Sequence, residues 1–247
     1  MFYVRKGLND IRMVYHGTSC GLNLALWEPH LGLPIIQHTL RALLPGYSQC
    51  YMDTGEMFLN PPLHPDLRPF AGLDIPHINI RQDEEVWDQY RTRFWGRWDK
   101  NFMGLTDPPY RYLKLLINFK FTAYGERKYP LNPFQWSQVQ LNLPGDESYT
   151  PKLSWVTKVR SDGHLASEVF IYVDDGQIIA HSELVCWQAE KIFCSTCNSL
   201  GIQDAPRKRT EPSLTPGPWA GTVAHTSNKE VAITVTHIKW GKKGVLS

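Results

Sequence analysis

Strands are predicted where apolar residues alternate with polar ones or run up to a turn. Residues 2–15 have β-prone residues on both sides of a Gly-Leu-Asn-Asp sequence, which predicts a hairpin. Residues 49–54 predict a short strand that runs into an acidic residue. The strongest pattern is residues 168–180, where an apolar and aromatic run precedes two aspartates and a glycine. Because Asp-Gly favours tight turns, Asp175 and Gly176 are predicted to turn this hairpin.

Helices are predicted where apolar residues recur at helical spacing. Residues 34–44 show this spacing and stop before a Pro-Gly pair, and residues 108–124 begin with two prolines that suit a helix start. Residues 182–200 carry the clearest apolar stripe, with Ser182 as the expected N-cap and Gly201 as the stop. We expect the three helices to pack on one face of an antiparallel sheet, in an α+β fold.

Three other segments give weaker patterns. Residues 82–101 are rich in charge and tryptophan and predict a helix. Residues 125–163 are rich in Pro, Asn, Gly, Ser and aromatic residues, which is typical of a long insertion or loop. Residues 231–235 are β-prone and predict a strand in the tail.

The composition fits a globular protein and excludes few functions. The 247 residues are enough for one large domain or two small ones, and 42% hydrophobic residues can supply a core. The net charge of +2 does not exclude nucleic-acid binding, because basic side chains can be concentrated in a cleft. There is no signal-peptide pattern and no apolar run of about 18 residues. We expect an intracellular protein without a membrane partner, in either the cytoplasm or the nucleus.

The cysteines do not predict a disulfide framework, because an odd number stands at irregular spacing. Cys194 and Cys197 form a C-x-x-C sequence, but no second ligand pair follows at a spacing that suits zinc. Reduced thiols on a helix face are the favoured interpretation.

The paired acids are the most unusual feature. Asp174 and Asp175 follow an apolar strand, and Asp53 ends another. Adjacent carboxylates repel each other unless a cation offsets them. A structural turn remains an alternative. If the two strands are neighbours, however, three carboxylates can bind two hard cations, Mg²⁺ or also Mn²⁺, as a site for nucleotidyl transfer requires.

The sequence Tyr172-Val173-Asp174-Asp175 resembles the metal-binding motif of reverse transcriptases. Asp53, followed five residues later by Phe58, resembles the first acidic motif of that family. The resemblance implies that all three aspartates bind metal and that Phe58 excludes the ribose 2′-hydroxyl. It continues through Pro62-Leu63, Asp66-Leu67-Arg68 and Phe70-Ala71.

Residues 103–109 resemble the family segment that opens a helix beside the template and the incoming nucleotide. Gly104 and Pro109 match, Met103 stands in a variable position, and Pro108 replaces the usual serine. The resemblance implies that Met103 and Gly104 contact substrate.

The first hairpin resembles the family's fingers hairpin, in which a lysine and an arginine hold the triphosphate. Lys6 and Arg12 are the implied pair, and the planar donor fork of arginine suits phosphate. A solvated basic pair is the alternative. His16 stands where Asp or Asn is expected.

Two later residues extend the resemblance. Lys208 lies in a basic run where the family places a residue that can protonate the departing pyrophosphate, and a solvated basic run is the alternative. Trp219 begins a Trp-Ala-Gly sequence that resembles the primer grip, and an ordinary packed aromatic is the alternative.

The chain is therefore interpreted as a retrotransposon- or retrovirus-type RNA-directed DNA polymerase with its thumb largely absent. Its implied partners are an RNA or DNA template with a primer, deoxynucleoside triphosphates, and further polyprotein domains (ribonuclease H, integrase or recombinase) outside this chain. The expected parts are fingers at 1–45 and 70–102, palm at 46–69 and 103–224 with the insertion at about 125–163, and a tail at 225–247.

Two other functions stay in view. A truncated or degenerate remnant that binds nucleic acid without catalysis would fit the replaced serine and the short length of the chain. An RNA-directed RNA polymerase fits less well, because Val173 stands where such enzymes have glycine and Phe58 is large.

Overall fold

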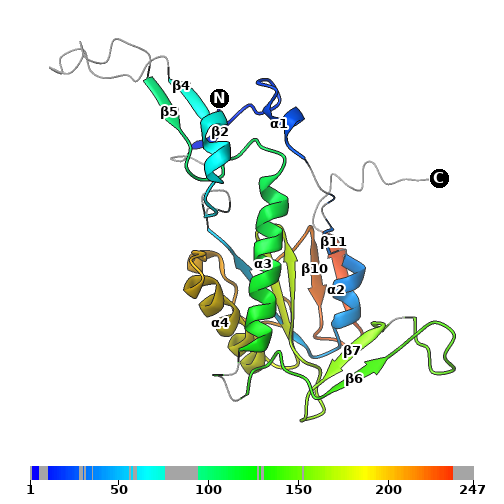
Figure 1. The fold of residues 1–247 in the computed structure, drawn as a ribbon. Helices are drawn as coiled ribbons and strands as arrows, with labels where there is room; N and C mark the ends of the chain where they lie inside the picture. The colour runs from blue at the N-terminus through cyan, green and yellow to red at the C-terminus, as the bar shows by residue number, and fades with distance from the viewer. Residues whose placement is uncertain are drawn as a thin grey trace. The chain divides into compact units, whose positions relative to one another are not determined.

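The computed structural model forms two compact units, each built from two segments of the chain (Figure 1). One combines Met1–His30 with Glu56–Tyr112, and the other combines Leu31–Gly55 with Leu113–Ser247. The predicted fingers and palm boundaries remain predictions, and these units divide the chain differently. The structure describes residues 2–5, 11–27, 30, 32–34, 36–55, 57, 60–75, 94–126, 128, 131–151 and 153–235.

The centre of the second unit is an antiparallel sheet. Its strands β3 (Ser48–Asp53), β9 (Asp175–Ala180) and β8 (Glu168–Tyr172) lie in the order β3-β9-β8. β3 and β9 are buried over almost their whole length, because both faces of the sheet are covered. The predicted strand and hairpin are confirmed, and so is the mixture of helices with an antiparallel sheet.

Helix α4 (Glu183–Ser199) covers one face of this sheet. The Sγ atoms of Cys186 and Cys50 lie 3.4 Å apart, and Cys194 Sγ lies 3.8 Å from Met52 Sδ. All five cysteines are free, as predicted.

The ends of α4 follow from its sequence. The Ser182 hydroxyl accepts a hydrogen bond from the Val185 amide at 3.4 Å, which satisfies one of the free donors of the first turn. Gly201 follows the helix with φ +85°, a conformation that glycine adopts without strain. The predicted N-cap and stop are confirmed.

The opposite face packs against α2 (Ile36–Ala42) and β10 (Thr222–His225). Ile178 and Ile179 are consecutive in β9 and point to opposite faces. Ile178 shares the α4 face with its register partner Cys50, which contacts Cys186 of α4, and Ile179 points into a second apolar cluster. The prediction that three helices share one face is therefore wrong for α2, because its apolar residues pack on the face opposite α4. This cluster contains Leu43, Ile179 and Ala224, flanked by Leu40, Ala42, Tyr47, Phe170 and Val231.

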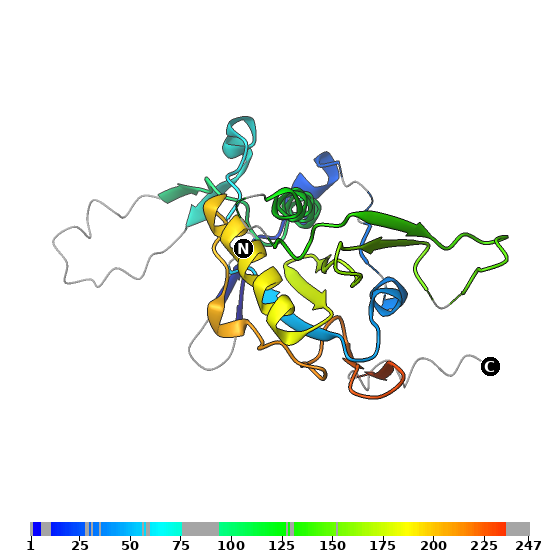
Figure 2. The same cartoon turned by 90° about the horizontal axis from the view of Figure 1, so that it is seen from below.

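Helix α3 (Pro108–Gly125), seen nearly end-on in Figure 2, is bonded to β8 by polar side chains. Lys120 Nζ donates to the carbonyl oxygen of Val169 at 2.7 Å and pairs with Glu168 at 2.5 Å. The Tyr124 hydroxyl donates to the same carboxylate at 2.5 Å. No described helix is long and apolar enough to span a bilayer.

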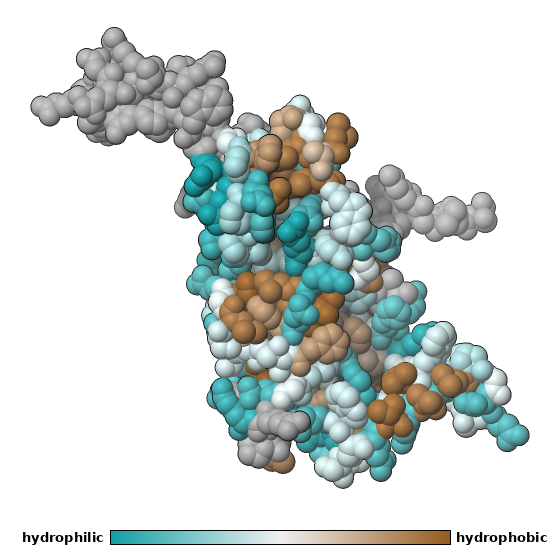
Figure 3. All heavy atoms as spheres, in the orientation of Figure 1, coloured by the Kyte–Doolittle hydropathy of each residue, from teal (hydrophilic) through white to brown (hydrophobic). Residues whose placement is uncertain are grey.

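The region expected to be a long loop contains a hairpin, β6 (Gln138–Leu141) with β7 (Val156–Val159). The alternation in β6 covers only four residues, too few to stand out in the sequence. Figure 3 shows apolar surface on this hairpin, to which the exposed side chains of Val139, Leu141 and Val156 contribute.

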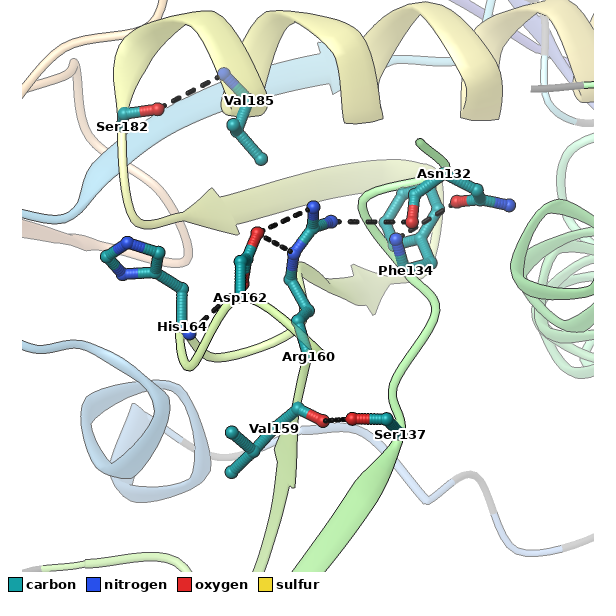
Figure 4. A network of polar contacts seen from close by, with 9 residues as sticks. All are labelled: Asn132, Phe134, Ser137, Val159, Arg160, Asp162, His164, Ser182 and Val185. Carbon is teal, nitrogen blue, oxygen red and sulfur yellow. Dashed lines mark hydrogen bonds and ion pairs between the residues drawn. The ribbon is translucent and has the colours of Figure 1, made fainter. Parts of the chain in front are cut away.

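Arg160 fixes the base of this hairpin (Figure 4). Its guanidinium donates to Asp162 at 3.0 Å and to the carbonyl oxygen of Asn132 at 3.4 Å. The other oxygen of Asp162 accepts from the His164 amide at 3.1 Å, and Asn132 donates to Ala123 in α3 at 3.0 Å. The hairpin is thereby bonded to the end of α3.

A last hairpin pairs β10 with β11 (Ala232–Val235), which confirms the predicted strand in the tail. The buried Gln49 side chain donates to the carbonyl oxygen of Ala224 in β10 at 3.0 Å. This bond ties the last hairpin to the central sheet.

The described residues of the first unit form two hairpins. β1 (Phe2–Arg5) pairs with β2 (Ile11–Val14) as predicted, and β4 (Gly72–Ile75) pairs with β5 (Phe94–Arg97). The predicted helix over 82–101 is wrong at β5, and its residues 82–93 lie outside the described part. Short helices occur at α1 (Leu22–Ala25) and η2 (Pro65–Phe70), around a core of Leu63, Ala71 and Phe102 with Tyr15, Leu67, Trp98 and Leu105.

Gly104 joins the first hairpin to the segment before α3. Its φ is +112°, and a Cβ atom there would lie 1.8 Å from the carbonyl oxygen of Tyr15. The Tyr15 amide donates to the carbonyl oxygen of Met103 at 2.8 Å, and the Asn23 side chain donates to that of Gly104 at 3.0 Å. Only glycine fits this contact.

Gly104→Ala is expected to destabilise the first unit by about 3 kcal/mol, because it adds both a clash and a strained backbone. Gly72→Ala is the matched control in the same unit, since nothing lies within 4 Å of its Cβ position. Urea denaturation of both variants measures the difference. Equal stability of the two would contradict the close contact at Gly104.

Candidate functional site

The acidic ends of β3 and β9 lie side by side. Asp53 is the register partner of Asp175, which is also the partner of Tyr172 across the hairpin. Thr54 donates to the carbonyl oxygen of Asp174 from its amide at 3.2 Å and from its hydroxyl at 3.1 Å. Since antiparallel partners have Cα atoms about 4.5–5.5 Å apart, Asp53 and Asp175 lie close together at one end of the sheet, with the backbone of Asp174 beside them.

The loop of the hairpin lies two residues before the Asp175-Gly176 pair that was predicted to form the turn. Its loop is Val173 and Asp174, and Val173 has φ 59°, an uncommon conformation for a β-branched residue. Gly176 instead lies within β9, where its Cβ position would be 2.9 Å from Met52 Cγ. Glycine is needed at this position because the two strands approach each other closely. The strained residue is Val173, at the tip of the hairpin beside the aspartates.

The segment after α4 runs along the free edge of β3 and brings Lys208 to the site. The Ala205 amide donates to the carbonyl oxygen of Asp53 at 2.9 Å, and the Tyr51 amide donates to the Thr210 hydroxyl at 2.8 Å. Between these bonds, in the 3-10 turn η4 (Pro206–Lys208), Lys208 Nζ lies 2.5 Å from Asp53 Oδ2.

Charge is concentrated at this end of the sheet. Burial, and then the charges of Asp174 and Asp53, raise the pKa of Asp175 to about 6, while Lys208 opposes the shift. Asp53 Oδ1 is buried and has no hydrogen-bond partner. Repelling carboxylates with a buried, unsatisfied oxygen are a donor set that fits a hard divalent cation.

The fit is incomplete in this conformation. Among the described residues, no three His, Cys, Asp or Glu side chains converge as a ready metal-binding group. Lys208 already holds one oxygen of Asp53, so the carboxylates are near one another without forming a shared ligand shell.

The raised pKa of Asp175 predicts that stability falls as pH rises. The ordinary pKa is 3.8 and the folded value is about 6, so between them the folded protein keeps a proton that the unfolded chain releases. Asp175→Asn is therefore expected to stabilise the protein at pH 7.5 by about 1 kcal/mol after allowance for solvent screening, and by almost nothing at pH 3.5. Urea denaturation at both pH values tests this. A pH-independent effect would contradict the repulsion.

Trp219 closes the site from another side. Trp219 and Thr222 exchange hydrogen bonds of 2.7 and 2.9 Å across a turn in which Ala220 and Gly221 both have positive φ. The buried Trp219 ring meets the Tyr172 ring edge-on, with centroids 6.2 Å apart. A cavity of about 260 Å³ results, lined by Tyr51, Met52, Asp53, Asp175, Lys208, Thr210 and residues 217–220.

Comparison with known proteins shows a likeness of fold and none of sequence. No protein-family model matches the chain, and no curated protein matches it. A solved structure of a foamy viral protease-reverse transcriptase, in complex with double-stranded DNA, superposes with a TM-score of 0.59 at 12% identity. The match covers 99% of this chain and 32% of that chain, so this chain spans about a third of the viral protein. The chain has a reverse transcriptase-like fold.

The other residues that the sequence predicted to contact substrate belong to the first unit. Met103 and Gly104 are bonded to the first hairpin as described above. Lys6 and Phe58 lie outside the described residues, and for Arg12 only the backbone, paired with Val4, is described. Their predicted roles stay predictions.

A buried ion network behind the site was not predicted. Arg209 pairs with Asp204 and lies 4.0 Å from Glu190 Oε1 of α4, which fixes the segment that carries Lys208. A charged residue on the otherwise apolar buried face of α4 was the available signal. Its partner could not be inferred, because it lies in a basic run that resembles a solvated surface.

Proposed function

We propose that the chain is a template-directed nucleotidyltransferase, an RNA-directed DNA polymerase of retroelement origin, acting at Asp53, Asp174 and Asp175. The pairing of Asp53 with Asp175 in adjacent strands carries this proposal. It places acids on the sheet of a reverse transcriptase-like fold, at the edge of a cavity. The reaction would be attack of a primer 3′-hydroxyl on the α-phosphate of a deoxynucleotide, with release of pyrophosphate.

The three aspartates would hold two Mg²⁺ ions, for which Mn²⁺ can substitute. Such ions, when bound, lower the pKa of the attacking hydroxyl and stabilise the leaving pyrophosphate. The buried, unpaired Oδ1 of Asp53 and the raised pKa of Asp175 support this ligand set.

Residues that line the cavity, together with Tyr172 beside it, would contact the primer end and the leaving pyrophosphate. Lys208 would donate a proton to the departing pyrophosphate, which its position beside Asp53 supports. Tyr172 and Trp219, in edge-on contact, would support the primer end. The turn at Trp219 has the backbone of a tight hairpin, as expected of a primer grip.

The remaining roles rest on the sequence resemblance. Lys6 and Arg12 would bind the triphosphate, Phe58 would select deoxyribose, and Met103 with Gly104 would lie near the template. The two units would correspond to parts of fingers and palm. A template with its primer would be the macromolecular partner, and ribonuclease H, integrase or recombinase would be supplied outside this chain.

Primer extension tests the proposed function directly. The chain is incubated with a DNA primer on an RNA template, deoxynucleotides and Mg²⁺ or Mn²⁺, beside its Asp174→Asn variant. Extension by the chain and its loss in the variant are the expected results.

A non-catalytic nucleic-acid-binding remnant is the second candidate. The absence of a converged acidic group among the described residues favours it. Retention of the primer–template in a gel-shift experiment, with no extension under either ion, would establish this alternative over the polymerase.

A further inference from the structure

The contact between Lys208 and Asp53 carries an inference about how the metal site is controlled. The ammonium nitrogen lies 2.5 Å from Oδ2, while Oδ1 of the same carboxylate is buried and unpaired. One oxygen of the carboxylate is therefore paired with a side chain, and the other has no hydrogen-bond partner. An unsatisfied buried oxygen is costly, so the arrangement is suited to a ligand that completes it.

The position of Lys208 is built by the surrounding segment rather than by the ion pair alone. Backbone bonds hold this segment to β3 on both sides of the lysine, at Asp53 and Tyr51. The adjacent Arg209 pairs with the buried Asp204 and lies 4.0 Å from Glu190 Oε1 of α4.

The lysine side chain itself can move. It is 45% exposed, whereas the Asp53 side chain is 18% exposed. Lys208 also lines the adjoining cavity, which offers the ammonium a second position away from the carboxylate. The backbone provides a fixed anchor and the long side chain provides two available positions.

We propose that Lys208 is an internal counter-ion that occupies Asp53 in the ion-free protein and competes with the divalent cation for that carboxylate. This inference rests on the proposed function, because it concerns the same three aspartates. It gives Lys208 two successive positions: on Asp53 before the ion binds, and free towards the pyrophosphate afterwards. The lysine thereby limits ion binding and becomes available as a proton donor only at a loaded site.

Competition predicts that removing the ammonium tightens ion binding. Lys208→Ala and Lys208→Met, the latter keeping an unbranched side chain, are titrated with Mn²⁺ and the free ion is measured by electron paramagnetic resonance. Each variant is expected to bind the ion about fivefold more tightly than the unmodified chain, the magnitude of a partly exposed ion pair. Arg207→Ala is the control, since it removes a neighbouring exposed cation from the same turn; its affinity is expected to stay within about twofold of the unmodified chain.

A second measurement uses the unmodified chain and so does not depend on the folding of a variant. Lys208 is acetylated with an amine-reactive ester, with and without Mg²⁺, and its modification rate is followed by mass spectrometry. Release from Asp53 is expected to speed the modification at Lys208 relative to exposed Lys191.

The outcomes separate the inference from the proposed function. Equal Mn²⁺ affinities in the unmodified chain and the Lys208 variants, or a modification rate that Mg²⁺ leaves unchanged, would overturn the competition while leaving the ion site intact. If neither the unmodified chain nor its variants bind Mn²⁺ at millimolar concentration, both the competition and the proposed metal-dependent function are overturned. Tighter binding in both variants with faster modification supports the counter-ion role.

Discussion

Asp53→Asn is expected to lower the rate of primer extension by about 1,000-fold, the effect of losing several kcal/mol of metal electrostatics. Asparagine keeps the shape of the side chain but lacks the negative charge. In the unmodified chain that charge pairs with Lys208, and it is the charge that would hold the ion. Steady-state extension on an RNA template measures the loss.

Asp146→Asn is the control for this change. It makes the same substitution in an exposed loop between β6 and β7, away from the site. Thermal unfolding should show both variants folded. Extension within tenfold of the unmodified chain in a folded Asp53→Asn protein would remove Asp53 from the proposed ligand set.

Lys208→Ala is expected to lower the extension rate by about 100- to 10,000-fold, the range for loss of a general acid. The same change should tighten Mn²⁺ binding, so the affinity for the ion is predicted to rise while the extension rate falls. A purely structural role for the lysine would not produce that combination.

Arg207→Ala tests whether charge alone explains the effect. Arg207 belongs to the same turn and is exposed, but only Lys208 reaches Asp53. The arginine variant should extend primers within about threefold of the unmodified chain. Equal losses in both variants would indicate a general role of the basic run in binding nucleic acid.

The sequence predicts the central sheet well because strong local patterns and tertiary packing agree there. The apolar run before Tyr172, the cap at Ser182 and the glycine at Gly201 each specify structure within a few residues. The approach of Asp53 to Asp175 is less local. It was inferred from the order of motifs in a known family, and the antiparallel register provides it.

Long-range packing explains where the sequence misleads. Asp175-Gly176 reads as a turn, yet the glycine is required by Met52 on the adjacent strand, which no local pattern reveals. The helical reading of residues 82–101 fails at β5, where pairing with β4 outweighs local preference. The Arg209 network is hidden for a similar reason, because Glu190 lies in α4 whereas Asp204 and Arg209 lie in the segment that follows it.

The most direct test is a crystal structure of the chain with Mn²⁺, in which anomalous scattering locates the ions. Two ions, roughly 3.5–4 Å apart and coordinated by Asp53, Asp174 and Asp175, are predicted, with Lys208 withdrawn from Asp53. At saturating Mn²⁺, carboxylates without an anomalous peak, and Lys208 still paired with Asp53, would contradict the proposed metal site.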